Sequence, residues 1–564
     1  MFIIYQKDQE SPDWNTEWKS GEMLSARHFL VHKGKKREKF YKDQCFIQDE
    51  KQIIVFDGVL LNSSDLFSKY KVETVVELIR VLFERDRDFF KEFRGNFNGC
   101  VYDLNQNTLL IFADHLSNKP IFYYEDSDCF IAGASVWEIV DFCKKHNKLK
   151  LDRGGCYSLI TYAYMYHDVT LFEGIKRLLP GWYLTVENDV VKKHQFYEIT
   201  RKNCIDISME EAIDKIDELF LKAIKTQVEK NKEYGYDNYA PLSAGLDSRI
   251  TTMALNRLGA DNIINFTYSE TNQLDQRLPM KIAKDLGNVW LFKSLDNGLD
   301  LFDIDTALEI GDSLLYYAWP SQLENFMKLV NSEKMGVIHT GVIGDVVVGT
   351  FIGKDGGRKG SYNIGDGAYS KKLVDKLKEN IKESHYESYE IGMMYNRAIN
   401  GAAMGYSTTF KKYAEACSPF MDIDLLDFCF SLPIAYQLQH RIYYKWVEKC
   451  YPQAMRYSHN GLKISTSNIG FRVKGKFIKL NTIPSRIRII LKNRIDRESG
   501  MNPIDYWYTN NMNLARYMDD YFSRCTKLKE LDDELYRDAK WLYESGNAIE
   551  KIMAISLVGS VERI

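Results

Sequence analysis

The stretch YAPLSAGLDSR, residues 239–249, passes from an apolar run through a turn of small residues into a helical pattern. The chain then repeats this order, with apolar runs at 263–269 (IINFTYS) and 337–342 (VIHTGV) and helical periodicity between them. Because strands that alternate with helices pair in parallel, this region predicts a parallel sheet with crossover helices. Upstream, SMEEAIDKIDELFLKAIKTQVEK offers an N-cap at Ser208, an acidic first turn and apolar three-to-four spacing, which predicts a long helix.

The turn has the chemistry of a phosphate site. A strand that runs through a tight turn into a helix aims several backbone N–H groups and the positive helix end at one point. Ala244 and Gly245 leave room for phosphates to approach the main chain. Ser243 and Ser248 add hydroxyl donors, and Asp247 can hold the Mg²⁺ that accompanies phosphates. A Walker loop would need G-x-x-x-x-G-K-S/T instead, and a small-residue turn with a purely structural role is the competing interpretation.

The first 200 or so residues show a different pattern. Short runs with β-branched or aromatic alternation are separated by turns, as in QIIVFDGVLL, GNFNGCVYDL, TLLIFADH, KPIFYYED and CFIAGAS. Helical periodicity at 73–83 and 136–144 makes this half an α+β layered domain with packed antiparallel sheets. The pattern changes near 199–205, so we expect one domain over residues 1–205 and a second over residues 206–564.

The last third of the chain, from about Asp366 to Ile564, is mostly helical by pattern. Within it, Arg472 to Arg497 is dense in Arg and Lys with almost no acid. A solvated basic face explains this stretch, and so does contact with an acidic acceptor or a membrane surface. The glycine- and lysine-rich stretch from Phe351 to Tyr369 suits a loop or lid.

Composition excludes several classes of protein. With 564 residues, 45% apolar and 27% charged, the chain is typical of a globular protein of two or more domains. A net charge of −3 favours no nucleic-acid partner. Ten scattered cysteines without a C-x-x-C pair argue against zinc and a disulfide framework, and fit a reducing cytoplasm. No basic leader and no apolar run of roughly 18 to 20 residues is present, so we expect neither export nor a transmembrane segment.

Several segments together resemble one superfamily. SAGLDSR, 243–249, resembles the SGGLDS pyrophosphate loop of the asparagine synthetases and β-lactam synthetases, with alanine for the first glycine. TGVIGD, 340–345, is similar to their S-G-x-G-x-D segment, and EACSPFMD, 415–422, resembles E-x-R-x-P-F-x-D with Cys417 in place of arginine. DGVLLN, FRGNFNGCVYD, ADHLSNKPIFYY and LFEGIKRLLPGWYL look like successive parts of the N-terminal glutaminase-type domain. The matches cover most of the chain and weaken past about residue 470.

This resemblance implies a fold and a set of site residues. The fold would be an α+β sandwich of glutaminase, Ntn-hydrolase-like type, followed by an α/β parallel-sheet ATP-pyrophosphatase domain with a mostly helical C-terminal part. The cofactors would be ATP and Mg²⁺, with Asp247 and Asp345 as metal ligands. The residues around ATP would be Leu242, Ser243, Ala244, Gly245, Asp247, Ser248, Tyr268, Thr340 and Gly341. Glu415 would be the base, and Lys463, or else His459, would stand in for the pyrophosphate-binding lysine, although Lys463 also fits a surface lysine.

The chain departs from the superfamily at two functional points. Glutamine-dependent members use an N-terminal cysteine as nucleophile and its α-amine as base. Position 2 is Phe2, and Cys45 has no evident activating base, so we expect a glutaminase fold without glutaminase activity. The glutamine-pocket segment N-G-E-I-Y-N is also altered, to DGVLLN at 57–62. Val342 occupies the position of the family's glutamate or tyrosine, so either Glu415 serves as base alone or the acceptor differs.

The resemblance implies an ATP-dependent ligase that adenylates a carboxylate and transfers the acyl group to ammonia or an amine. The nitrogen could come from free ammonia, from a partner enzyme or from the acceptor itself. We rank amidation of a glycan or small-molecule acid first, and a lasso-type peptide cyclase or lactam cyclase second. A catalytically silent nucleotide-binding protein is a further alternative, against which the two aspartates speak. Another ATP pyrophosphatase, such as a tRNA-modifying enzyme, should show a basic RNA-binding face or catalytic cysteines. Homodimerisation stays open.

Overall fold

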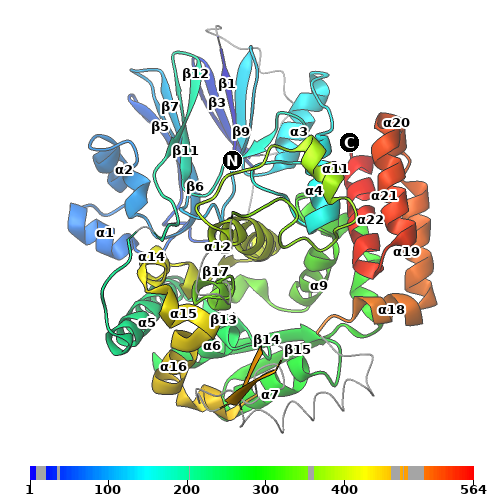
Figure 1. Cartoon of the computed structure of the whole chain (residues 1–564). Coiled ribbons are helices and arrows are strands. Elements are labelled where there is room, and N and C mark those ends of the chain that lie inside the picture. Colours follow the sequence, from blue (N-terminus) through cyan, green and yellow to red (C-terminus); the bar gives the residue numbers. More distant parts are fainter. Residues whose placement is uncertain are drawn as a thin grey trace.

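The computed structural model describes residues 1–7, 21–34, 39–201, 203–352, 361–458, 470–473, 476–479 and 501–564. In this part of the chain, two six-stranded antiparallel sheets come from the first 195 residues, and a five-stranded parallel sheet lies after them (Figure 1). The antiparallel sheets and the alternating strand and helix order after residue 208 confirm the sequence-based expectations.

The N-terminal sheets face each other across a shared core. The first has the order β10 (Lys176–Arg177), β8 (Phe122–Glu125), β9 (Cys129–Gly133), β1 (Phe2–Gln6), β3 (Phe29–Gly34) and β2 (Gly21–Ala26). The second has the order β12 (Val190–Gln195), β11 (Trp182–Glu187), β7 (Thr108–Ala113), β6 (Gly95–Asp103), β5 (Gln52–Leu60) and β4 (Cys45–Gln48). Ile3 and Tyr5 of β1 pack with Ile53 and Val55 of β5. Side chains alternate along a strand, so the neighbours of Ile3 face the other way.

Helices cover the outer faces of both sheets, which gives a four-layer arrangement. Helices α1 (Ser63–Tyr70) and α2 (Val75–Phe83) pack on the second sheet, and α3 (Val136–Lys145) and α4 (Arg153–Tyr162) pack on the first. Phe2 and Ile4 belong to this outer layer and lie in one apolar cluster with Ile139 of α3. The four residues from Phe2 to Tyr5 therefore all contribute to packing on one side or the other.

The parallel sheet has the order β15 (Val289–Ser294), β14 (Ile263–Ser269), β13 (Asp237–Pro241), β16 (Met335–His339) and β17 (Glu415–Cys417). All four strand pairs are parallel. The connecting helices are α5 (Met209–Tyr234), α6 (Asp247–Arg257), α7 (Leu274–Leu286), α8 (Ile304–Ile310) and α9 (Ala318–Met327). α5 begins with the capping box that Ser208 and Glu211 predict. α7 accommodates Pro279 inside its first two turns.

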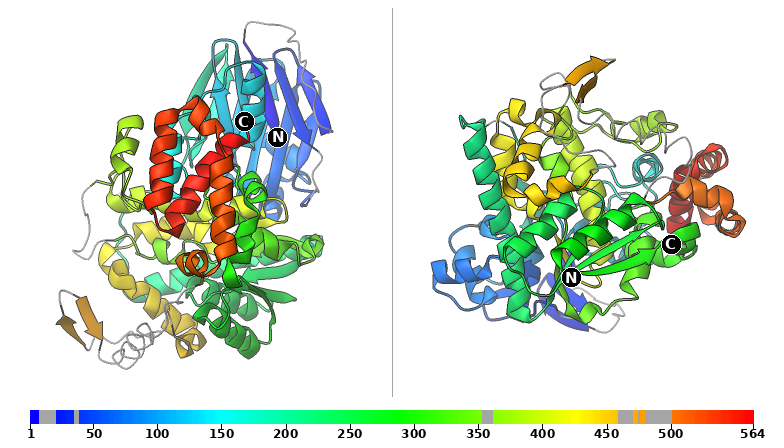
Figure 2. Two further views of the ribbon diagram at one scale, coloured as in Figure 1. Left: turned by 90° about the vertical axis from the view of Figure 1, so that its right-hand side faces the viewer. Right: turned by 90° about the horizontal axis from the view of Figure 1, so that it is seen from below.

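The rest of the described chain is mainly helical. After α10 (Gly344–Val347) come α11 (Val374–Asn380), α12 (Tyr389–Met393), a π-helix (Met394–Ala403), α13 (Met404–Phe410), α14 (Ile423–Ser431), α15 (Ile434–Gln437) and α16 (Arg441–Cys450). The C-terminal helices are α18 (Ile504–Asn510), α19 (Met512–Arg524), α20 (Lys527–Leu531), α21 (Asp533–Ser545) and α22 (Ala548–Glu562). These orange and red helices lie against α4 and α8 (Figures 1 and 2), and Arg153 of α4 forms an ion pair with Asp532 at 2.6 Å.

Two sequence-based expectations concern membranes and charge. Within the described ranges, no helix is long and apolar enough to cross a membrane.

Of the basic stretch Arg472 to Arg497, the structure describes only the residues that belong to β18 (Gly470–Val473) and β19 (Lys476–Lys479), which pair as an antiparallel hairpin. The remainder lies outside the described residues, as do residues 353–360 of the predicted lid.

Buried His115 makes stability depend on pH. Burial, aided by the charge of Arg94, lowers the pKa of His115 to about 3, whereas an unfolded histidine titrates near 6.5. The unfolded chain therefore binds a proton that the folded chain does not, so stability present above about pH 6.5 is lost as pH falls towards 3. We expect His115→Phe to reduce the loss of unfolding free energy between pH 6.5 and 5.5 by about 1 kcal/mol. Denaturant titrations at both values check this, and an unchanged loss in the variant would contradict it.

Candidate active site

Two loops meet at the carboxyl edge of the parallel sheet. One leads from β13 through residues 242–246 into α6, and the other leads from β16 through residues 340–343 into α10. The backbone N–H of Asp345 donates to Asp247 Oδ2 at 3.0 Å across 98 residues of sequence. Ligands of open parallel sheets bind at this edge. The structure therefore brings together the two aspartates that the sequence analysis selected as metal ligands.

Small residues allow this close approach. A Cβ on Gly341 would lie 2.6 Å from the carbonyl carbon of Asp247, and one on Gly344 would lie 2.7 Å from Asp247 Cγ. Between them, Ile343 has φ of +61°, a left-handed conformation that is strained for a β-branched residue. Backbone strain of this kind concentrates at functional sites.

The carboxylates of Asp247 and Asp345 repel each other. Burial, followed by the charge of Asp345, raises the pKa of Asp247 to about 7. Tyr443 of α16 donates its hydroxyl to Asp247 Oδ1, and Thr350 Oγ1 donates to Asp345 Oδ2 at 2.6 Å. A cation between the carboxylates would relieve their repulsion. Two carboxylates fit Mg²⁺, which takes one or two protein carboxylates together with substrate phosphates, and no cluster of three or more His, Cys, Asp or Glu is found in the described ranges.

The loop itself is held by internal hydrogen bonds. Ser243 N donates to Ser248 Oγ at 3.1 Å, Ala244 N donates to Asp275 Oδ1 at 2.9 Å, and Gly245 N donates to Ser243 Oγ at 3.1 Å. Leu242 N is bonded to the carbonyl of Phe266 on β14. A bound pyrophosphate would have to replace these contacts of Ser243, Ala244 and Gly245.

Arg249 joins the loop to the C-terminal part. Its fully buried guanidinium donates from Nη2 to Ala244 O at 3.1 Å and to Ser458 O at 2.8 Å. Ser458 therefore lies beside the loop. Lys463 and His459, the expected pyrophosphate-binding residues, lie outside the described residues. Arg249 and Tyr443 could not be selected from the sequence, because nothing in a single sequence shows that a helix residue reaches a distant segment.

The remaining expected ATP residues line neighbouring strands. Tyr268 lies near the carboxyl end of β14, where burial and the adjacent Tyr406 raise its pKa well above 10. Thr340 N donates to Cys417 O at 2.8 Å, and Ser418 Oγ donates to Val342 O at 2.9 Å. The loop that carries Asp345 is thus bonded directly to the end of β17.

Glu415 lies on β17, two residues before Cys417. Glu415 Oε1 accepts a hydrogen bond from Lys119 Nζ at 2.8 Å, and Lys119 also pairs with Asp57 Oδ2 at 3.2 Å. Within the described part of the chain, no hydrogen bond joins Glu415 to Asp247 or Asp345. The structure therefore places the expected base on the strand next to the aspartate pair but binds its carboxylate to the N-terminal half.

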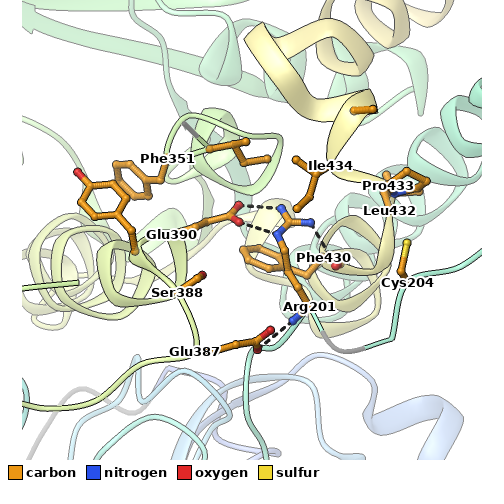
Figure 3. Close-up of a pocket in the computed structure, with 13 residues that line it drawn as sticks. Arg201, Cys204, Phe351, Glu387, Ser388, Glu390, Phe430, Leu432, Pro433 and Ile434 are labelled. Atoms are coloured by element: carbon orange, nitrogen blue, oxygen red, sulfur yellow. Dashed lines mark hydrogen bonds and ion pairs between the residues drawn. The ribbon is translucent and has the colours of Figure 1, made fainter. Parts of the chain in front are cut away.

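A cavity of about 520 Å³ lies among the chain segments around Arg201, Glu390 and Phe430 (Figure 3). Phe351, which follows Thr350, lines it together with Phe430, Leu432, Pro433 and Ile434. Arg201 crosses the floor and is paired with Glu390 at 2.5 Å, as Figure 3 shows. Glu387 also borders a second cavity of about 250 Å³, which has aromatic and amide groups in its wall: Trp182, Gln195, Tyr386, Tyr395 and Asn400.

The N-terminal half shows no activated thiol in its described residues. Phe2 is buried in β1, where it pairs with His32 of β3 and Gly133 of β9. The cysteines before residue 200 are all buried, and burial raises the pKa of each thiol: Cys45, Cys100, Cys129, Cys143 and Cys156. A protonated buried thiol is a poor nucleophile.

Comparisons with known proteins agree with the N-terminal architecture. A glutamine amidotransferase domain family matches residues 8–197. Two Methanocaldococcus jannaschii proteins described as putative glutamine-hydrolyzing asparagine synthetases are similar to the chain. The first is 24% identical over 242 residues, which cover 41% of this chain and 46% of that protein. The second is 21% identical over 467 residues, which cover 77% of this chain and 74% of that protein. The chain thus spans less than half the length of the first relative.

Solved structures add little. Glutamine phosphoribosylpyrophosphate amidotransferase from B. subtilis, complexed with ADP and GMP, matches at a TM-score of 0.23 and 10% identity, covering 48% of this chain and 78% of that one. An allosteric regulatory enzyme of purine biosynthesis matches at 0.23 and 9%, covering 51% and 58%. TM-scores this low carry no argument about the chain.

Proposed function

We propose that this chain, which is related to the asparagine synthetases, is an ATP-dependent ligase that adenylates a carboxylate and converts it to an amide. The observation that carries the proposal is the pairing of Asp247 with Asp345 where the SAGLDSR loop meets residues 340–345. A catalytically silent nucleotide-binding protein has no use for two partly buried carboxylates that repel each other, because holding like charges close together costs stability.

The reaction would proceed in two steps. A carboxylate oxygen of the acid attacks the α-phosphorus of ATP, the bond to the bridging oxygen breaks, and pyrophosphate leaves. Ammonia or an amine then attacks the acyl carbon, the bond to the AMP oxygen breaks, and the nitrogen loses a proton. With ammonia the products are a primary amide, AMP and a proton. On this proposal Glu415 accepts that proton as general base.

The chain's own residues would bind and orient the nucleotide. Ser243, Ser248 and the N–H groups of Ala244 and Gly245 would bind pyrophosphate, with Lys463 stabilising its developing charge. Leu242, Thr340 and Gly341 would form the floor of the site, and Tyr268 would lie near the nucleobase. Asp247 and Asp345 would hold Mg²⁺, which supplies positive charge to the phosphates when bound.

We further propose that residues 1–205 form a glutaminase-type domain without glutaminase activity and that residues 206–564 form the synthetase domain. Buried Phe2 and the protonated thiols of the described cysteines support the loss of the nucleophile. Asp57, at the start of the altered glutamine-pocket segment, is paired with Lys119, which supports the loss of the glutamine site. The nitrogen donor would then be ammonia, a partner enzyme or the acceptor's own amine.

The linings of the two cavities, of about 520 and 250 Å³, suggest which class of acid the protein acts on. Aromatic rings beside amides, as in the cavity of Trp182 and Gln195, suit a hydroxylated ligand such as a sugar acid. The apolar walls around Phe351 and Ile434 suit a peptide or another apolar acyl chain, and this observation favours the cyclase as the second candidate.

A panel assay tests the proposal. The purified protein is given ATP, Mg²⁺, ammonium and either uronic acids, aspartate or peptides, and AMP and pyrophosphate are measured. We expect AMP formation that depends on one class of acid, and no glutamate release from glutamine. Tight ATP binding without AMP formation across the panel would favour the silent protein, and glutamate release would overturn the loss of glutaminase activity.

A further inference from the structure

Lys119 lies in a small cavity between the N-terminal sheets and β17. Its side chain, 22% exposed, bridges the carboxylates of Asp57 and Glu415, which are 15% and 16% exposed. Burial acts to lower the pKa of Lys119, but the charges of Asp57 and Glu415 outweigh it and raise the pKa, so the ammonium group stays charged. The other charged groups that line the cavity are Lys33, Lys39, Asp312, Lys411 and Lys412.

The N-terminal half also contacts β17 and α14 close to Glu415. Asn96 Nδ2 donates to the carbonyl of Ala416 at 2.9 Å, and Arg94 pairs with Asp424 at 2.9 Å. One residue beyond Ala416, the carbonyl of Cys417 accepts from Thr340 N. A continuous set of contacts therefore runs from β6 through β17 to the loop that carries Asp345.

We infer that Lys119 is a positioning residue that holds the carboxylate of Glu415 in the orientation needed for transfer of the acyl group to nitrogen. The hydrogen bond from Lys119 Nζ fixes one oxygen of this carboxylate, and a general base must lie within hydrogen-bond reach of the proton that it accepts. The inference rests on the proposed function. It gives the N-terminal half a role after the loss of glutaminase activity, because Lys119 reaches Glu415 from that half.

Because Lys119 acts only through Glu415, the two steps of the reaction should respond differently to its removal. Adenylation involves the aspartate pair and the SAGLDSR loop, whereas acyl transfer involves Glu415. We expect Lys119→Met to lower ammonium-dependent amide formation about 10- to 100-fold and to leave carboxylate-dependent exchange of pyrophosphate into ATP within about twofold. Lys119→Arg, which keeps the charge, should recover most of the amide formation.

Lys148 offers a matched control, because it bridges two carboxylates in the same half, Asp126 at 2.6 Å and Asp128 at 3.1 Å, without contact to β17. Lys148→Met should leave both steps unchanged. In a Glu415→Gln background, Lys119→Met should have no further effect on amide formation.

The possible outcomes distinguish a failure of the role inferred for Lys119 from a failure of the proposed ligase function. Loss of both steps together in Lys119→Met, or a full additional loss in the Glu415→Gln background, would show a structural role and overturn the inference while the ligase stands. Absence of carboxylate-dependent exchange in the wild-type protein would overturn the proposed function and the inference with it.

Discussion

Asp247→Asn should abolish AMP formation, with a fall of about 10²- to 10³-fold or more, because it removes a charge that the phosphates need at the point of bond breaking. The fold should survive. Asparagine can accept from Asp345 N through Oδ1 and donate from Nδ2 to a rotated Tyr443 hydroxyl, so both present contacts have replacements. Removal of a partly buried charge whose pKa desolvation raises to about 7 should leave the melting temperature unchanged or higher.

The measurement pairs AMP release with thermal unfolding. Asp261→Asn is the matched control, because this exposed aspartate lies just before β14 at the opposite end of the same sheet. The control should match wild type in both assays. AMP release by Asp247→Asn at the wild-type rate would remove Asp247 from the site, and a large drop in melting temperature would leave misfolding as the cause of lost activity.

Glu415→Gln should separate the two halves of the reaction. Loss of a general base typically lowers a rate by about 10²- to 10⁴-fold, and we expect this loss in amide formation while pyrophosphate exchange continues. Glutamine keeps an acceptor for Lys119 at almost the same position, so the contact at 2.8 Å need not be lost.

Quantifying the amide and the exchanged label in the same preparation tests this separation. Glu379→Gln, an exposed change on α11, is the control and should alter neither rate. Undiminished amide formation in Glu415→Gln would show that another group accepts the proton, and equal loss of both steps would show that Glu415 acts in adenylation.

Much of this architecture could be predicted from the sequence. The capping residue Ser208, the order of strands around 239–249 and the alternation in the first 200 residues each depend on local pattern, and each appears as expected. β17 could not be predicted, since a strand of three residues carries no periodicity.

Only part of the candidate site could be predicted from the sequence. The resemblance selected Asp247 and Asp345, and the structure places them in contact. Tyr443, Thr350, Arg249 and Lys119 reach the site or its base through tertiary contacts alone, over sequence separations such as 196 residues for Tyr443 to Asp247 and 296 for Lys119 to Glu415. Their chemistry, a hydroxyl or a cation on an ordinary helix or loop, gives no local signal.

The most direct test of carboxylate adenylation follows an oxygen atom. The acid that stimulates AMP release is labelled with ¹⁸O in its carboxylate, and the AMP is analysed by mass spectrometry after complete turnover with ammonium. If the carboxylate attacks the α-phosphorus, one ¹⁸O atom should appear in each AMP molecule. AMP without the label would show that water or another group attacks ATP, and would contradict the account.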